Sequence, residues 1–179
     1  MTNVELRQGT GTESGLTPGS LDVVVMRHVL AHNGAEEAAI VAHLATLVKP
    51  GGCVYLVDID GTAFRMMDLD PDLEDLHDTF VEFHRRKDND LQPGLRLGKQ
   101  LRAAGLEVLE HIGRYDVLQA PPGMRPPSWA AREAMVEESV ITEDDVSRWG
   151  RAFERLDQQA LRPTVFGAAF VAIGRRPTN

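Results

Sequence analysis

The sequence contains one cysteine, Cys53, among its 179 residues, and it has no long apolar run near its N-terminus. A single cysteine can form neither a disulfide within the chain nor a thiolate-rich zinc site, so we expect a reducing, cytoplasmic location. The longest apolar run near the N-terminus covers residues 23–26, which is too short to cross a bilayer or to form a signal-peptide core. We therefore expect neither a membrane anchor nor a targeting segment.

Positive charge is also scarce, because 19 lysines and arginines stand against 27 aspartates and glutamates, which gives a net charge of −8. The short basic runs at 84–87 and 175–176 are flanked by acidic residues or by the chain end, and no aromatic stripe accompanies them. This pattern argues against nucleic acid or an anionic membrane as a partner. With 42% hydrophobic residues, the chain is expected to form one compact domain.

What the sequence does contain is an alternation of strand and helix signals. Residues 21–26 and 53–57 are β-branched, almost continuous apolar runs that are typical of strands buried on both faces, and residues 35–48 have helical spacing. A strand, a helix and a second strand form a βαβ unit with parallel strands. The sequence therefore predicts an α/β fold.

The rest of the chain predicts further helices and strands around a loop at 119–127. These elements are helices at 70–87, 95–104, 128–138 and 143–161, and strands at 106–110 and 165–173. The segment 121–161 lies between the last two predicted strands and interrupts the hairpin that they would otherwise form. We expect it to form a helical, lid-like insertion. Its large apolar residues Trp129, Met135 and Trp149 are expected in the core of that insertion.

A glycine-rich run at 9–15 follows a predicted strand at 4–8 and superficially resembles a phosphate-binding loop. Such a loop must open onto a helix N-terminus, whose free N–H groups hold the phosphate, whereas residues 16–19 lead into a strand. A flexible connection is therefore favoured. A nucleotide-dependent oxidoreductase of the Rossmann type is disfavoured for the same reason.

Four motifs follow one another along the chain: LDVVVMRHVLAH at 21–32, KPGG at 49–52, LRAAGL at 101–106 and a closing strand within 166–177. Together they resemble the second half of a class I S-adenosylmethionine-dependent methyltransferase, with Leu21 in place of the usual aromatic residue. The resemblance implies a partial Rossmann-like sheet, mostly parallel with an antiparallel last strand, and helices on both faces.

The resemblance also implies that part of the family's fold is missing. The family's first strand, its glycine-rich cofactor loop and the acidic residue that holds the cofactor ribose would lie before residue 4. We therefore expect residues 1–179 to form a single domain that is truncated at its N-terminus. The strand at 21–26 would then be an open apolar edge, and we expect a homodimer, a partner subunit or the local N-terminal segment to cover it.

Ligands of open α/β sheets bind outside the carboxyl ends of the strands. The resemblance places Met26, Arg27 and His28 beside the methionine part of S-adenosylmethionine, and Thr10 and Gly11 on its adenine side. An aspartate usually contacts adenine at the latter place, and this sequence has none there. The alternatives are core packing for Met26 and a solvated strand end for Arg27 and His28.

Further residues are candidates for binding the methyl acceptor: Asp58, Asp60, Arg65, His84 and Tyr115. Asp58 and Asp60 follow the strand at 53–57 on the same side of an extended chain, where two carboxylates can anchor an amine, take a proton or hold a metal. No histidine stands at a fixed spacing from them, so no metal site is predicted. A turn-capping role for Asp60 and a half-buried sheet position for Tyr115 are the alternatives.

The function that the resemblance implies is S-adenosylmethionine-dependent methyl transfer to a small molecule. In that reaction the protein mainly aligns an oxygen, nitrogen or carbon nucleophile with a methyl group that is already reactive. Activity is expected to need a missing N-terminal half or a partner chain. The alternative is a non-catalytic protein of the same fold that dimerises or acts as a binding module.

Overall fold

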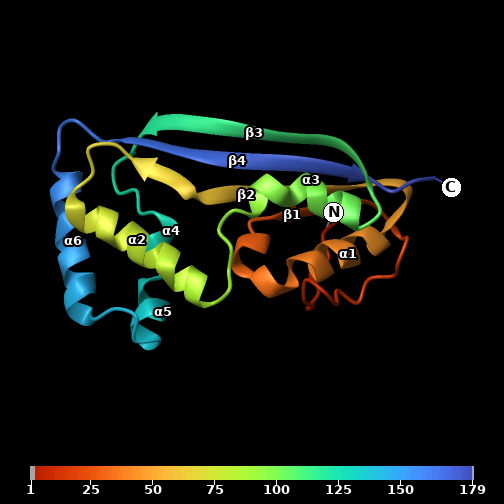
Figure 1. The fold of residues 1–179 in the computed structure, drawn as a ribbon, viewed down its shortest axis with the longest axis horizontal. Coiled ribbons are helices and arrows are strands. Elements are labelled where there is room, and N and C mark those ends of the chain that lie inside the picture. The colour runs from red at the N-terminus through yellow and green to blue at the C-terminus, as the bar shows by residue number, and fades with distance from the viewer. Residues whose placement is uncertain (1–2, 179) are drawn as a thin grey trace. The chain divides into compact units, whose positions relative to one another are not determined.

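The computed structural model describes residues 3–178 and shows a mixed α/β chain (Figure 1). Its strands are β1 (Leu21–Arg27), β2 (Val48–Met66), β3 (Glu107–Gln119) and β4 (Thr164–Arg175). Its helices are α1 (Glu37–Leu47), α2 (Pro71–Arg86), α3 (Leu97–Ala103), α4 (Pro127–Ala130), α5 (Arg132–Glu137) and α6 (Glu143–Asp157), with 3-10 turns at Leu30–His32, Gly34–Glu36 and Pro93–Arg96. No helix within residues 3–178 has the length and apolar character needed to cross a membrane.

The strands form one sheet in the order β1-β2-β4-β3. β1 and β2 are parallel, with Val24 opposite Val54 and Met26 opposite Leu56. Figure 1 shows β4 running in the direction opposite to β2 and β3. The predicted fold class, a mostly parallel sheet with an antiparallel last strand, is therefore confirmed. Because β1 has only β2 as a neighbour among the described strands, it is an edge strand of the sheet.

The described residues divide into two compact units. The first unit contains residues 3–60, 92–114 and 169–178, and the second contains residues 61–91 and 115–168. The predicted helical insertion at 121–161 thus falls within the second unit, together with α2.

The core of the first unit lies on one face of its strands. Val24, Val54 and Leu56 pack with α1 and α3, which contact each other on that face (Figure 1). On the other face, Val23 is 51% exposed and Val25 is 67% exposed. The expectations that residues 21–26 are buried on both faces and that helices cover both faces are therefore not met in this unit, because α1 and α3 share one face.

Two expectations about strand limits also need correction. Residues 4–8 do not form a strand, since no described strand pairs with them, and Val4 and Leu6 are 75% and 93% exposed. β2 continues to Met66, so Asp58 and Asp60 lie inside this strand and not beyond its end. The cause is pairing with β4, which is still present where the Met67 N–H donates to the Thr164 carbonyl at 2.8 Å.

The second unit is built around α2 and α6, which pack against each other. Trp149 on α6 is 1% exposed, and its Nε1–H donates to Asp75 of α2 at 3.1 Å. Arg148 of α6 donates to Asp72 and Asp75 of α2 at 2.8 and 2.6 Å. As predicted, Trp149 and Met135 are core residues of this unit.

Candidate functional site

The first candidate site lies at the carboxyl end of β1. Met26 is half-buried and packs against the core, whereas Arg27 and His28 are exposed. The His28 N–H donates to the Val57 carbonyl at 2.9 Å, and its backbone then turns into the left-handed region with a φ of +54°. This turn directs the chain away from the strand and leaves the guanidinium and imidazole at the strand end.

Asp58 of β2 is the buried partner of this strand end. It is 1% exposed, and its Oδ2 accepts a hydrogen bond from the Leu30 N–H at 3.2 Å. Its Oδ1 accepts from the Ile59 N–H at 2.9 Å and lies 3.8 Å from His28 Nδ1. A carboxylate whose two oxygens already accept backbone hydrogen bonds positions the chain, and we assign Asp58 this role here.

The connection between His28, Leu30 and Asp58 is not visible in the sequence as a motif, because it joins positions 28 and 58. A signal for part of it exists, however. Asp58 has the same parity as the buried residues Val54 and Leu56, so a strand that continues past residue 57 places its carboxylate on the core face. A buried carboxylate needs hydrogen-bond partners, and the turn at Leu30 supplies one.

The other candidates of the first unit occupy separate positions. The Asp60 carboxylate accepts from the Gln92 side chain at 3.3 Å, so it is held within its unit. Thr10 Oγ1 accepts from the Glu13 N–H at 2.9 Å in a closed turn. Gly11 lies against α1, where an added Cβ would be 3.0 Å from Cγ1 of Ile40.

Thr10 also lines a wide hollow of about 610 Å³ along the N-terminal segment. The other lining residues are Glu5, Arg7, Gly9, Ser14, Leu16, Thr17, Ser20 and Leu21. Thr10 is thus next to a space that a ligand can enter, whereas the position of Gly11 is explained by close packing.

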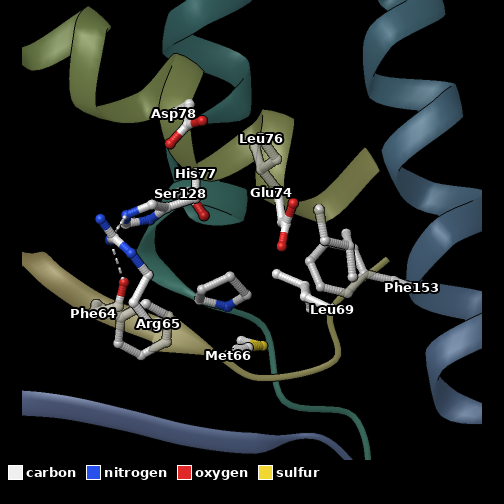
Figure 2. Close-up of a pocket in the computed structure, with 12 residues that line it drawn as sticks. Phe64, Arg65, Met66, Leu69, Glu74, Leu76, His77, Asp78, Ser128 and Phe153 are labelled. Atoms are coloured by element: carbon white, nitrogen blue, oxygen red, sulfur yellow. Dashed lines mark hydrogen bonds between the residues drawn. The ribbon is translucent and has the colours of Figure 1, made fainter. Parts of the chain in front are cut away.

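The second unit contains a cavity of about 280 Å³ between the end of β2, α2, α4 and α6 (Figure 2). Arg65, which the sequence singles out, lines it. The remaining lining residues are Phe64, Met66, Leu69, Leu73, Glu74, Leu76, His77, Asp78, Pro126, Ser128 and Phe153. Sequence reasoning missed His77, Glu74 and Ser128, because these polar residues meet only when three distant segments pack together.

His77 gives this cavity an uncharged imidazole. Burial lowers its pKa from 6.5, the positive charge of Arg65 lowers it further, and Asp78 raises it in part. Arg65 Nη1 donates to His77 Nε2 at 3.0 Å, and since a guanidinium can only donate, the proton of the neutral ring lies on Nδ1.

The last two predicted residues have different surroundings. His84 is 6% exposed and packs against the ring of Phe80 at a centroid distance of 4.5 Å, edge to face. Tyr115 on β3 is 62% exposed, which differs from the half-buried alternative. The structure therefore brings together His28 with Asp58, and Arg65 with His77, and it places His84 in aromatic packing. Within the described residues, no group of three or more acidic, histidine or cysteine side chains is arranged to hold a metal ion.

Comparison with known proteins agrees with this fold. The family model for a methyltransferase domain matches residues 1–56. A candidate methyltransferase from Bacillus halodurans is 19% identical, has a TM-score of 0.54, and is matched over 98% of this chain and 78% of that one. The YcgJ protein from Bacillus subtilis is 18% identical, has a TM-score of 0.51, and is matched over 99% and 73%. No curated protein matches the sequence.

The chain therefore has the fold of the class I S-adenosylmethionine-dependent methyltransferases, as the four sequence motifs indicate. Within it, residues 1–56 are the part that matches the methyltransferase domain family. This part contains β1, α1 and the beginning of β2, and with them the strand-end residues Arg27 and His28.

Proposed function

We propose that this chain takes part in S-adenosylmethionine-dependent methyl transfer to a small-molecule acceptor, and that it does so with a partner chain at the free edge of β1. The observation that carries the proposal is the arrangement at the end of β1. There the guanidinium of Arg27 and the imidazole of His28 are exposed, and buried Asp58 fixes the turn that follows.

The residues at this strand end fit one part of the cofactor. Arg27 and His28 are donors, which suits the carboxylate of the methionine moiety. Asp58 is not suited to the ribose hydroxyls, because its oxygens already accept from Leu30 and Ile59. The fit is thus to the amino-acid end of the cofactor, and groups for the ribose must come from elsewhere.

S-adenosylmethionine, when bound, supplies a methyl group on a positively charged sulfur that a nucleophile can attack directly. The chain's own contribution is to hold and orient. Arg27 would bind the cofactor carboxylate, and Asp58 would keep the Leu30 turn in place, so that the carboxyl end of β1 stays fixed beside β2. Catalysis of this kind rests mainly on alignment of the two reactants.

The partner chain is supported by the state of β1. It is an edge strand, and its residues Val23 and Val25 are 51% and 67% exposed on the face opposite the core. An edge strand with exposed apolar side chains is a template for pairing with another chain. A second copy or a different subunit that adds a strand here would also bring new groups to the carboxyl end of β1.

A small-molecule acceptor is supported by the cavity of the second unit. Its volume of about 280 Å³ is near the lower end of the range for small-ligand pockets. The net charge of −8 weighs against a nucleic-acid acceptor.

The cofactor part is tested by calorimetric titration of the chain with S-adenosylmethionine and S-adenosylhomocysteine. We expect saturable binding, weakened about tenfold in Arg27→Gln because a charge-assisted hydrogen bond is lost. Arg102→Gln is the matched control, since Arg102 is also an exposed arginine of the first unit, on α3. No binding at millimolar ligand, or equal loss in both variants, would overturn this part.

The partner part is tested by sedimentation velocity at tens of micromolar protein. We expect an assembly larger than the monomer, and we expect Val25→Lys to dissociate it, because the charge lies on the exposed face of β1. A wild-type chain that sediments as a monomer, alone and in mixtures with its co-purifying proteins, would contradict the proposal that β1 is covered.

A further inference from the structure

The cavity of the second unit has Arg65, His77 and Ser128 at one end and mainly apolar walls elsewhere, where the Glu74 carboxylate also lies (Figure 2). In Figure 2, Arg65, His77 and Ser128 gather at one end, away from Phe153. The apolar walls come from aromatic, proline and aliphatic side chains: Phe64, Met66, Leu69, Leu73, Leu76, Pro126 and Phe153. Such a division suits a ligand with one polar group on a compact apolar body.

Arg65 is an exposed cation whose hydrogen-bond partners are uncharged. Its Nη1 donates to the carbonyls of Thr62 and Phe64 at 2.6 and 2.8 Å, and to His77 Nε2 at 3.0 Å. No carboxylate of the described residues is within ion-pair distance of it. Of the eight other arginines of this unit, seven are paired with carboxylates, namely Arg85, Arg86, Arg125, Arg132, Arg148, Arg155 and Arg162, and exposed Arg151 has no such pair among the described residues.

The hydrogen bonds of Arg65 also fix its orientation. The two N–H groups of Nη1 are shared among three acceptors, which hold that corner of the guanidinium, while the Nε–H and the Nη2 group are left as the pair of parallel donors that binds a carboxylate in two-pronged fashion. A guanidinium that is already oriented loses little freedom when such an anion binds.

Ser128 supplies a second polar group on the wall of the cavity. Its residue is 2% exposed, its side chain lines the cavity, and no hydrogen bond of the described residues involves its hydroxyl. Its hydroxyl is not among the fully buried side-chain atoms that lack a partner, so it is open to the cavity, and a hydroxyl there can donate or accept a hydrogen bond. In Figure 2 its oxygen points into the cavity, where it can donate to a bound group.

Two acidic residues of α2, Glu74 and Asp78, also line the cavity and oppose an anion. Both are exposed, as Arg65 itself is, so water and salt screen all three charges. Arg65 binds an anion by direct contact, and a direct charge-assisted hydrogen bond exceeds the screened repulsion of hydrated carboxylates. The balance therefore favours an anionic group at the Arg65 end.

We propose that this cavity binds a small aromatic carboxylate, whose carboxylate group accepts hydrogen bonds from Arg65 and Ser128 and whose ring packs between Phe64, Pro126 and Phe153. An aromatic body is favoured because two aromatic rings and a proline line the apolar part, and rings pack well edge to face. The volume of about 280 Å³ limits the ligand to a compact body such as a single substituted ring. The inference rests on the cavity alone and does not depend on methyl transfer.

The test is titration of the full chain, without cofactor, with benzoate, benzylamine and acetate, followed by calorimetry and by NMR shifts of the His77 ring. Benzoate should bind more tightly than both other probes. Arg65→Gln should weaken benzoate binding about tenfold or more and Ser128→Ala about threefold, because each removes a donor to the carboxylate. Glu74→Gln should tighten it about twofold by removing a screened repulsion.

Arg151→Gln is the matched control, because Arg151 is an exposed arginine of α6 that does not line the cavity. This variant should bind benzoate as the wild-type chain does. Circular dichroism of each variant shows whether it is folded, and Arg65→Lys, which keeps the charge and loses the two-pronged donor, should fall between wild type and Arg65→Gln.

Several results would overturn the proposal. Tighter binding of benzylamine than of benzoate, with loss in Glu74→Gln, would show a cation site. Equal affinity for acetate and benzoate would show that the cavity does not recognise an aromatic ring. Benzoate affinity that is the same in Arg65→Gln and wild type, with both folded, would exclude Arg65 as the anion-binding group, as would failure of benzoate to bind at tens of millimolar. Since S-adenosylhomocysteine is absent from these titrations, their failure leaves the proposed methyl transfer unaffected.

Discussion

Replacement of Asp58 gives the sharpest test of how the carboxyl end of β1 is built. Asp58→Ala removes the acceptor of the Leu30 N–H, and because both residues are buried, at 1% and 0% exposure, water cannot easily replace it. A buried donor left without a partner costs about 1–3 kcal/mol, and the lost hydrogen bond is to a charged group, so we expect about 2–3 kcal/mol of destabilisation. For a chain of this size that lowers the melting temperature by roughly 4–12 °C.

Two variants separate the loss of the acceptor for the Leu30 N–H from the loss of a carboxylate charge. Asp58→Asn keeps an amide oxygen that can accept from Leu30, so it should cost only about 1 kcal/mol. Asp22→Asn removes an exposed carboxylate that pairs with Lys49 at 2.8 Å, and surface pairs contribute about 0–1 kcal/mol. The order of stability should be wild type, Asp22→Asn, Asp58→Asn and then Asp58→Ala.

The assay is thermal unfolding by circular dichroism together with hydrogen exchange of the Leu30 amide. Exchange is local, so it reports on this turn even if the two units unfold separately. Loss of about 2 kcal/mol corresponds to roughly 30-fold faster exchange at this amide when local opening controls it. An unchanged exchange rate at Leu30 in Asp58→Ala would refute the positioning role that we assign to Asp58.

Three further outcomes can be measured on the same protein. Gly113→Ala should lower the free energy of unfolding by about 1–3 kcal/mol, because its Cβ would be 2.6 Å from the Phe170 ring. Phe170→Leu should recover part of this loss in a double-mutant cycle of melting temperatures. Thr142→Ala should cost about 0.5–2 kcal/mol in urea unfolding, since Thr142 and Asp145 form a capping box at the start of α6; no change would argue against the cap. The pKa of His77 is lowered in the folded state, so the unfolded chain takes up its proton first, and stability should fall as the pH falls through 6.5. His77→Gln should reduce that slope, and an equal slope in both proteins would contradict the lowered pKa.

The sequence predicts the order of elements well because that order is written in local patterns. Helix α2 (Pro71–Arg86) falls within the predicted range 70–87, since apolar spacing, a proline in the first turn and the Asp70 cap all act within a few residues. The same holds for β1, whose β-branched run follows a turn. Local signals of this kind determine which element forms.

The ends of the strands and the contacts between side chains were less predictable, because they depend on residues that are distant in the sequence. Residues 4–8 have an alternating pattern but no partner strand in the described structure, and a strand exists only when it is paired. β2 extends to Met66 because β4, a hundred residues later, pairs with it. His77 and Ser128 share a cavity with Arg65 only after α2 and α4 have packed, and no spacing in the sequence encodes that meeting.

Asp58 and Arg65 were predicted for the same purpose, binding of the acceptor, and the contacts of each now separate them. Both oxygens of Asp58 accept from backbone N–H groups, so its charge serves the chain itself, and replacing it should alter stability first. Arg65 contacts only neutral acceptors on one side of its guanidinium, so its charge is available to a ligand, and replacing it should alter binding first. A charged residue at a predicted site is therefore better judged by whether its hydrogen-bonding capacity is already used than by its position at a strand end. By that criterion the search for a substrate begins with Arg65.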